Sequence, residues 1–363
     1  MSRRIIISGG GTGGHIFPAI SIANEICRRE PDADVLFVGA TGGMELTVVP
    51  RYQYKIEAVW ISGIHRQLTL QNISRNLLFP LKLVVSLIQA RRIVSRFRPQ
   101  AVVGVGGFAS GPLGRAAAGK GIPLFICEQN AFPGLVNRWL ASRATRILLG
   151  NPDAVKFFDA SKSVVTGNPI RSMQLPSREE AVAKLGLDPS RPVLLSLGGS
   201  LGALKINQAL LAPLPALTAS GVQLIWQCGK RYYETLRPQV PEHQDIKLMA
   251  FIEDMAVAYG AADLVISRAG GSTISELIAL SLPSILVPSP NVAEDHQTKN
   301  ARSLTDRGAA LLVSDAEAIE KLIPAALDVL RSPAALDKLK DNILAVEKHD
   351  AAREIVDEIY KHL

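Results

Sequence analysis

Short apolar runs alternate along the chain with longer segments in which apolar residues recur at helical spacing. The first run, at 5–7, is three isoleucines, and it passes through glycines into a segment with apolar side chains at 20, 22, 23 and 26. A run that is apolar throughout predicts a strand buried on both faces, as in a parallel sheet. Further strands are predicted at 34–38, 101–105, 124–127, 147–149, 164–165, 193–197, 223–227, 246–250, 264–267, 284–287 and 310–313.

The predicted strands and helices fall into two successive groups, which predicts an α/β fold with two doubly wound, Rossmann-like domains. An apolar strand, a glycine turn and a helix follow one another at the start of the chain and again from Val193. We expect the domains to span 1–165 and 166–345, with a C-terminal helix at 346–363 packing back on the first. Ligands bind outside the carboxyl ends of strands in such sheets, which favours a ligand in a cleft between the domains.

A glycine-rich turn at 8–14 leads through His15 into the first predicted helix. A strand that runs through glycines into a helix presents backbone N–H groups to an anion. Gly9, Gly11 and Gly14 also match the G-x-G-x-x-G dinucleotide pattern. That pattern needs an acid at the end of the second strand to hold a ribose, and no acid stands there. A nicotinamide-binding domain is therefore disfavoured.

Charge is distributed unevenly between the two halves of the chain. Residues 1–170 carry a net charge of +11 and residues 171–363 a net charge of −4, and no acidic residue lies between Glu57 and Glu128. A basic, aliphatic surface can bind nucleic acid or anionic lipid, or can simply be solvated. The acidic second half and the lack of an aromatic platform for bases disfavour a nucleic-acid binder.

The stretch at 64–98 mixes aliphatic with basic residues, among them Arg75, Phe79 and Lys82. An apolar face with a cationic collar is typical of an element at a membrane surface. Part of the stretch should also be core, with Phe79 and its neighbours near the exposed end. The apolar run at 77–90 is too short to span a bilayer, the chain starts without a secretory segment, and three separated cysteines indicate a reducing compartment. We therefore expect a cytoplasmic protein, peripheral on a membrane.

Eight motifs, spread over the whole chain, carry a family resemblance. The first half contains SGGGTGGHIFPAI at 8–20, GGFASGP at 106–112 and EQNAFPGLVNRWLA at 128–141. GNPIR at 167–171, GGSLGA at 198–203, FIEDM at 251–255, SRAGGSTISEL at 267–277 and EDHQTKNA at 294–301 complete the set. In these motifs and their order, the chain resembles the MurG family, the undecaprenyl-pyrophosphoryl-MurNAc-pentapeptide N-acetylglucosaminyltransferases of bacterial peptidoglycan synthesis.

The resemblance implies the GT-B fold and an inverting, metal-independent transfer that uses no cofactor. It implies that GlcNAc moves from UDP-GlcNAc to the C4 hydroxyl of MurNAc in lipid I, giving lipid II. It also implies a peripheral position on the cytoplasmic face of the bacterial membrane, with other cell-wall synthesis proteins as possible partners. The donor should bind to the second domain, and the acceptor and the membrane should meet the first.

The resemblance also implies roles for residues at the matching motif positions. Asn130 would face the GlcNAc, the backbone of Ile252 would bind uracil, and Glu276 would bind the ribose. The remaining substrate positions implied by the motifs are Thr12, Gly13, Gly14, Arg171, Ser200, Gly271, Ser272, Thr273 and Gln297. Some members of the family have Ala-Leu-Thr at 271–273, a departure that leaves Thr273 and Glu276 in place.

Several of these positions have a plainer alternative. His15 is the candidate general base, since imidazole titrates near working pH, or it only forms hydrogen bonds. Glu128 is the second candidate base, or a buried acid bonded to backbone amides. Glu276 binds a ribose or belongs to a capping box of its helix. Arg171 contacts the donor or braces the domain junction.

The pyrophosphate of the donor needs positive charge, and the sequence offers it without a metal. Ser272 or Thr273 is expected to cap a helix whose N-terminal N–H groups, with Ser200 and Arg171, would hold the leaving phosphate. The Asp-x-Asp pair at Asp32 and Asp34 precedes a strand, so a solvated turn is expected there and no metal site.

Two other classes of protein remain open. A sugar-nucleotide epimerase of related fold would bind UDP-GlcNAc but would not need a lipid-facing patch, and it would turn over without an acceptor. A membrane-bound scaffold without activity would not need the intact set of His15, Asn130, Arg171 and Glu276.

Overall fold

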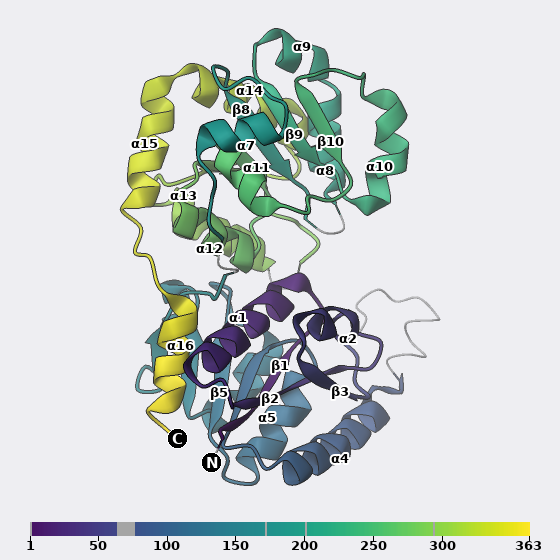
Figure 1. Ribbon diagram of the computed structural model, residues 1–363, viewed down its shortest axis with the longest axis vertical. Helices are drawn as coiled ribbons and strands as arrows, with labels where there is room; N and C mark the ends of the chain where they lie inside the picture. Colours follow the sequence, from purple (N-terminus) through teal and green to yellow (C-terminus); the bar gives the residue numbers. More distant parts are fainter. Residues whose placement is uncertain (1, 64–76, 171–172, 200–201, 293–294) are drawn as a thin grey trace. The chain divides into compact units, whose positions relative to one another are not determined.

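The computed structural model describes residues 2–63, 77–170, 173–199, 202–292 and 295–363. The chain forms two compact units (Figure 1). Met1–Arg171 and His349–Leu363 make up the first unit, and Ser172–Lys348 makes up the second. Each unit contains one parallel sheet between helices. These sheets confirm the predicted α/β class.

The first unit has a seven-stranded sheet in the order β3-β2-β1-β4-β5-β6-β7. Its strands are β1 (Arg4–Gly9), β2 (Asp34–Ala40), β3 (Lys55–Val59), β4 (Ala101–Gly106), β5 (Leu124–Glu128), β6 (Arg146–Leu149) and β7 (Ser163–Val165). Its helices are α1 (Gly13–Arg29), α2 (Glu45–Val48), α4 (Phe79–Phe97), α5 (Ser110–Ala118), α6 (Leu135–Leu140) and α16 (Ala351–Tyr360). Short 3₁₀ turns at Val49–Tyr52, Ala141–Arg143 and Pro152–Phe157 join them.

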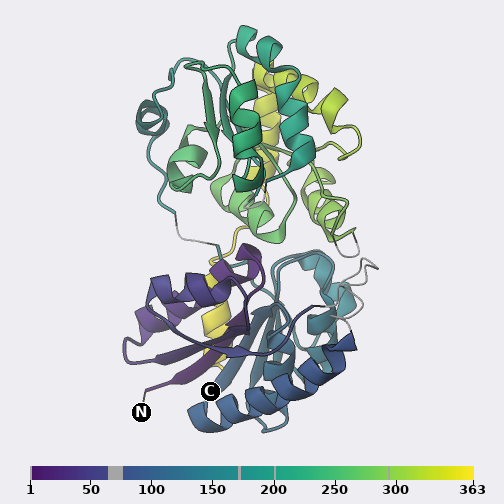
Figure 2. The same ribbon diagram turned by 90° about the vertical axis from the view of Figure 1, so that its right-hand side faces the viewer.

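Strand β1 lies at the centre of this sheet and is buried on both sides. Ile5 and Ile7 face α1 and α16, whereas Ile6 belongs to the apolar cluster that α4 and α5 cover on the opposite face. Figure 2 shows α4 running along its face of the strands. The strand order reverses between β1 and β4, so the loops after these two strands diverge at the point where doubly wound sheets bind ligands.

Every strand predicted from an apolar run is present, but β3 was not predicted. Among the described strands it lies at the edge of the sheet and pairs only with β2, and Val59 is its one buried residue. Its polar outer face gives no continuous apolar run, which explains why the pattern missed it.

The C-terminal helix α16 packs against α1 in the first unit, beside which it lies in Figure 1. Its buried side chains Ile355, Val356 and Ile359 join the apolar cluster beneath α1. An ion pair of 2.5 Å between Arg29 Nη1 and Asp357 Oδ1 links the two helices at their rim. The last residues of the chain therefore complete the core around its first strand.

The second unit has a six-stranded parallel sheet in the order β10-β9-β8-β11-β12-β13. Its strands are β8 (Val193–Leu197), β9 (Gln223–Gln227), β10 (Ile246–Met249), β11 (Leu264–Ser267), β12 (Ser284–Leu286) and β13 (Leu311–Leu312). Its helices are α7 (Arg178–Lys184), α8 (Leu204–Leu211), α9 (Leu214–Ala219), α10 (Lys230–Leu236), α11 (Met255–Ala261), α12 (Gly271–Leu280), α13 (His296–Thr305), α14 (Ala318–Arg331) and α15 (Pro333–Leu344), with a 3₁₀ turn at Arg237–Gln239.

Its strand order follows the same plan as that of the first six strands of the first unit, and its switch point lies between β8 and β11. The glycine turn after β8 and the start of α12 after β11 therefore lie at adjacent strand ends. In the ranges that the structure describes, no helix is both long and apolar enough to cross a membrane.

Candidate active site

In the first unit, three loops meet at the carboxyl ends of β1, β4 and β5. The buried Ser110 hydroxyl at the start of α5 donates to the carbonyl oxygens of Ser8 at 3.1 Å and Gly106 at 2.9 Å. Gln129 Nε2 donates to Val105 O at 2.7 Å, and Asn168 Nδ2 donates to Gln129 O at 2.9 Å. Side-chain hydrogen bonds thus tie the ends of neighbouring strands into one rim.

His15 lies in the first turn of α1, half-buried at this rim. Its Nδ1 is 3.0 Å from the carbonyl oxygen of Gly10 and 3.4 Å from Oγ1 of Thr12. A carbonyl oxygen can only accept, so the bond to Gly10 assigns the ring hydrogen to Nδ1. The neutral ring then carries its basic lone pair on Nε2, as a general base requires.

Two glycines after β4 allow the chain to pass close to this histidine. Gly106, at φ +118°, lies so near His15 that any side chain there would overlap the ring. Gly107, at φ +87°, lies equally close to the backbone of Gly10. Both positions therefore require glycine on grounds of backbone angle and of space.

The glycine turn after β1 is less open to an anion than its sequence predicts. The N–H of Gly10 donates to Gly106 O at 3.4 Å, and the N–H of Gly11 donates to Oε2 of Glu45 at 2.9 Å. Two of the backbone donors expected to bind an anion are therefore used within the protein. Thr12 is the N-cap residue of α1, and Gly13 and Gly14 form its first turn.

Glu128, at the end of β5, is 2% exposed and accepts four hydrogen bonds. Oε1 accepts from the backbone and side-chain nitrogens of Asn130 at 3.0 and 3.1 Å, and Oε2 accepts from Gly134 N and Asn137 Nδ2, both at 2.9 Å. These donors match the roughly four lone-pair positions of a carboxylate. The contacts favour a positioning role for Glu128, which orients Asn130, over the alternative of a general base.

In the second unit, the turn after β8 is held in place by its neighbour β9. Gly198 N donates to Gln227 O at 3.1 Å, and Gln227 Nε2 donates to Gly199 O at 2.8 Å. Gly202, at φ +80°, packs against the carbonyl of Cys228, where a side chain would not fit. Contacts with β9 and the residue after it thus hold Gly198, Gly199 and Gly202 in place. Ser200 lies outside the described residues.

Helix α12 starts at Gly271, with Gly270 as its N-cap residue. The expectation that Ser272 or Thr273 caps this helix is wrong, because both residues already lie inside its first turn. Glu276 is also too far along the helix for a capping box, whose acid occupies the third position. These three side chains are half-buried, so the first two turns of α12 present hydroxyl and carboxylate groups beside the helix N-terminus.

Oε2 of Glu276 accepts a hydrogen bond of 2.7 Å from the hydroxyl of Tyr259 on α11. Tyr259 is 1% exposed. Its burial and the nearby carboxylate raise the pKa of Tyr259 well above its usual range. Sequence reasoning missed Tyr259, and only its position in an apolar helix before β11 could have indicated a buried phenol.

The other donor positions fall at loop ends of the second unit or outside the described residues. Ile252, 6% exposed, lies between β10 and α11. Gln297, in the first turn of α13, accepts a bond of 2.9 Å from Ser289 N through Oε1. Arg171, like Ser200, lies outside the described residues.

Asp34 begins β2 at the end of the sheet opposite to these loops, and its carboxylate is 3.3 Å from Lys55 Nζ. Asp32 lies in the turn before it. In the described part of the chain, no three His, Cys, Asp or Glu side chains gather in a metal-binding cluster.

Of the three residues expected to face the membrane, Arg75 lies outside the described residues. Phe79 starts α4 and packs partly against the apolar core. Lys82 donates to Ser62 Oγ at 2.9 Å and lies 5.8 Å from the ring of Trp60. The exposed apolar side chains of this region are instead Leu77, Leu78, Leu81, Val84 and Ile88, which are between 45% and 76% exposed.

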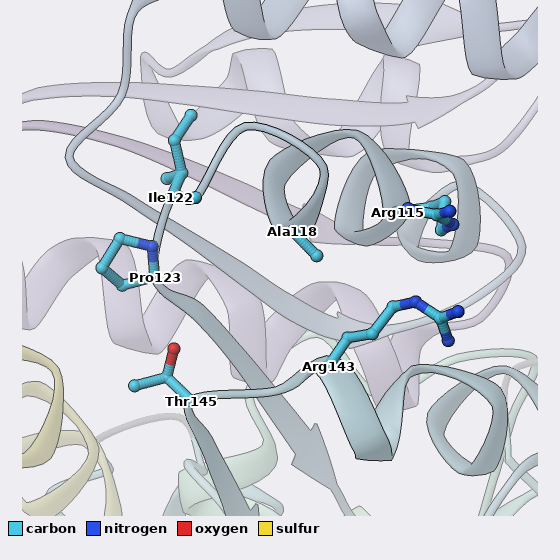
Figure 3. Close-up of a pocket in the computed structure, with 7 residues that line it drawn as sticks. Arg115, Ala118, Ile122, Pro123, Arg143 and Thr145 are labelled. Carbon is cyan, nitrogen blue, oxygen red and sulfur yellow. The ribbon is translucent and has the colours of Figure 1, made fainter.

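A pocket of about 350 Å³ in the first unit lies away from these loops. Arg115, Pro123, Arg143 and Thr145 are among the residues that line it (Figure 3). Pro123 and Thr145 immediately precede β5 and β6, so the pocket lies at the amino ends of the strands. It is therefore at the edge of the sheet opposite to His15 and does not belong to the candidate active site.

Two regions of the chain match the domains of one glycosyltransferase family. Residues 5–149 match the glycosyltransferase family 28 N-terminal domain, and residues 193–356 match the glycosyltransferase family 28 C-terminal domain. Together the two matches contain every described residue that the motifs assign to the substrates or to the base.

Relatives match over nearly the full length. The UDP-N-acetylglucosamine–N-acetylmuramyl-(pentapeptide) pyrophosphoryl-undecaprenol N-acetylglucosamine transferase of Phocaeicola vulgatus is 48% identical, covering 99% of this chain and 96% of the relative. The protein of the same name from Porphyromonas gingivalis is 49% identical, covering 98% of this chain and 94% of the relative.

Solved structures show the same architecture. A crystal structure of Acinetobacter baumannii MurG matches with a TM-score of 0.75 at 29% identity, covering 99% of each chain. A putative UDP-N-acetylglucosamine 2-epimerase from Listeria monocytogenes matches with a TM-score of 0.69, covering 100% of this chain and 97% of the other. Because the epimerase is only 17% identical, that likeness concerns the fold alone.

Proposed function

The chain belongs to the MurG family of N-acetylglucosamine transferases and has their GT-B fold, and from this premise we propose how its residues divide the reaction between them. The protein is a glycosyltransferase that moves GlcNAc from UDP-GlcNAc to the undecaprenyl-pyrophosphoryl-MurNAc-pentapeptide, lipid I, to give lipid II. The first unit supplies the base for the acceptor, and the second unit binds the donor.

The single observation that carries this proposal is the hydrogen bond from His15 Nδ1 to Gly10 O, which leaves Nε2 as the basic nitrogen. Nε2 takes the proton of the C4 hydroxyl of MurNAc. The hydroxyl oxygen bonds to the anomeric carbon of GlcNAc as the bond from that carbon to the phosphate oxygen breaks. The electron pair leaves with UDP, and attack from the opposite side inverts the anomeric configuration.

The donor is held by the loops at the switch point of the second sheet. Glu276, oriented by Tyr259, accepts hydrogen bonds from the ribose hydroxyls, and the backbone of Ile252 binds uracil. The first turn of α12 at Gly271, Ser272 and Thr273, with Ser200 and Arg171, offsets the charge that develops on the leaving pyrophosphate. Gln297 in the second unit is assigned to the sugar of the donor. Asn130 in the first unit, which Glu128 orients, is assigned to GlcNAc.

The first unit also meets the membrane, since the acceptor keeps its polyprenyl tail in the bilayer. Leu77, Leu78, Leu81, Val84 and Ile88 form an exposed apolar strip at the start of α4 and along it. Exposed Arg91, Arg92 and Arg96 follow on the same helix. Aliphatic side chains next to cations suit a reversible attachment to an anionic surface on the cytoplasmic side.

The test is a transfer assay with labelled UDP-GlcNAc and a lipid I analogue. We expect product with both substrates and none with UDP-GlcNAc alone, whereas an epimerase would convert UDP-GlcNAc without an acceptor. His15→Gln should lower kcat by about 100-fold or more while UDP still binds, because a general base contributes roughly 10²–10⁴-fold. Unchanged kcat in His15→Gln would refute the assignment of the base.

The same assay tests metal independence. Because α12, Ser200 and Arg171 are assigned the charge of the pyrophosphate, transfer should continue in EDTA. Loss of transfer in EDTA and its recovery with Mg²⁺, in an acceptor whose solubility neither reagent changes, would show that these groups do not suffice.

A further inference from the structure

Glu45 is a buried carboxylate in the first unit that the proposed mechanism does not use. It is 1% exposed at the start of α2, after the turn that follows β2. Oε1 accepts from Ala40 N at 2.8 Å, and Oε2 accepts from Gly11 N at 2.9 Å. Both oxygens of the carboxylate are thus held by backbone N–H groups.

Three glycines are packed against this carboxylate. A side chain at Gly10, Gly39 or Gly43 would overlap the Glu45 side chain. These glycines come from the turn after β1, from within β2 and from the turn before α2. Two loops and a strand thus have glycine where they pack against Glu45, and this close packing fixes the positions of the carboxylate oxygens.

The N–H that Glu45 accepts belongs to the same peptide unit as the carbonyl that holds His15. The Gly10–Gly11 peptide donates through its N–H to Glu45 Oε2 at 2.9 Å, and its C=O accepts from His15 Nδ1 at 3.0 Å. In a trans peptide the N–H and C=O point in opposite directions, so the unit joins the two side chains in a line. A carboxylate at one end polarises the peptide and strengthens the acceptor at the other.

We propose that Glu45 is a positioning residue for His15, acting through the Gly10–Gly11 peptide. This inference rests on the proposed function, in which His15 is the general base. Glu45 keeps the Gly10 carbonyl turned toward Nδ1, and so keeps the ring hydrogen on Nδ1 and the lone pair on Nε2. When Nε2 takes the acceptor proton, the polarised carbonyl stabilises the resulting imidazolium. Glu45 itself touches neither substrate nor the transferred proton.

The test combines steady-state kinetics with ¹⁵N spectra of protein labelled at its histidine rings. Glu45→Gln keeps the volume of the side chain but removes its charge and turns one acceptor into a donor. We expect kcat to fall about 10- to 100-fold, with KM for UDP-GlcNAc within about twofold of wild type. The His15 ring signals, assigned by their loss in His15→Gln, should show hydrogen on Nδ1 in wild type and a mixture of tautomers in Glu45→Gln.

Glu358→Gln is the matched control. Glu358 is another buried acid of the first unit, 6% exposed, and it pairs with Arg146 at the start of β6, far from the glycine turn. A loss of stability in this variant should leave kcat and the His15 tautomer unchanged. If Glu45→Gln does not fold, Glu45→Asp replaces it, because Asp keeps the charge but is too short to reach both N–H groups.

The outcomes separate this inference from the function on which it rests. If His15→Gln lowers kcat while the Glu45 variant has wild-type kcat and tautomer, the role of Glu45 is refuted and the base assignment stands. If His15→Gln transfers GlcNAc at the wild-type rate, the base assignment itself fails. A lower kcat in Glu45→Gln with an unchanged tautomer would also overturn the inference, since it would indicate a general loss of structure.

Discussion

The hydroxyl of Tyr259 donates to Oε2 of Glu276 at 2.7 Å, and this bond fixes the carboxylate at the start of α12. Because burial and the carboxylate raise the pKa of Tyr259 well above its usual range, the phenol keeps its proton at working pH. Tyr259→Phe removes this donor with little change in volume. We expect UDP to bind about 3- to 10-fold more weakly by calorimetry, because Glu276 keeps its own bonds to the ribose but loses the contact that orients it, a loss of the order of one ordinary hydrogen bond.

Removing the carboxylate itself should cost more. Glu276→Ala loses the proposed hydrogen bonds to the ribose hydroxyls, and we expect UDP binding to weaken by about 1.5–3 kcal/mol. Calorimetry with UDP, run beside thermal melts of the same protein, measures this. Wild-type UDP affinity in Glu276→Ala would reject the ribose assignment.

Gly106 lies so close to the His15 ring that a side chain at this position should displace the ring. Gly106→Ala places a methyl group against the imidazole at φ +118°, so we expect kcat to fall by about 100-fold because the base is displaced. The matched control is Gly121→Ala, since Gly121 also has a positive φ, +69°, but faces open space. The control should lose about 1 kcal/mol of stability and keep its rate of transfer.

The apolar strip of α4 predicts how the enzyme reaches its lipid acceptor. Leu81→Ser with Val84→Ser removes two exposed side chains, 53% and 55% exposed, and should weaken binding to anionic vesicles and transfer to long-chain lipid I. Transfer to a short-chain soluble acceptor should change less than twofold. Leu204→Ser, 49% exposed in the second unit, controls for general surface polarity. An equal loss of transfer rate with both acceptors would show that the strip stabilises the fold and does not bind the membrane.

An acid on α1 gives a prediction about pH. Glu25 accepts hydrogen bonds from Arg28 and Arg29, and these bonds lower the pKa of Glu25 to about 2. The folded pKa lies below the unfolded value of 4.5, so the stabilisation is present above about pH 4.5 and is lost as pH falls toward 2. The difference in Tm between wild type and Glu25→Gln should therefore shrink between pH 6 and pH 3. A difference that stays constant over that range would contradict the shift.

Runs of consecutive apolar residues were enough to predict every described strand except β3, because a strand covered on both faces carries apolar side chains throughout. The apolar pattern failed at β3, whose outer face is polar. The preference of hydroxyl residues for N-cap positions failed separately at α12, where Gly270 occupies the cap position. In both cases local composition is ambiguous, and the neighbouring strand or loop decides the structure.

Sequence motifs singled out His15 and Glu276, but not Glu45 and Tyr259, the groups that contact the Gly10–Gly11 peptide beside His15 and the carboxylate of Glu276. Glu45 and Tyr259 act through contacts 34 and 17 residues away along the chain, which no local pattern encodes. The glycines at 39 and 43 were the one sequence feature connected with the burial of Glu45, since they leave room for its side chain. Nothing in the sequence indicated that Lys82, predicted to face the membrane, would donate a hydrogen bond to Ser62.

The return of α16 to the first unit sets the order in which the chain can fold during synthesis. The ribosome makes Ile355, Val356 and Ile359 after the whole of the second unit, yet these side chains fill the core beneath α1, which is made before that unit. Until they emerge, the apolar face of α1 that they cover stays open to chaperones and to aggregation. The second unit, Ser172–Lys348, already has all its residues by then. The first unit is therefore begun before the second unit and completed after it.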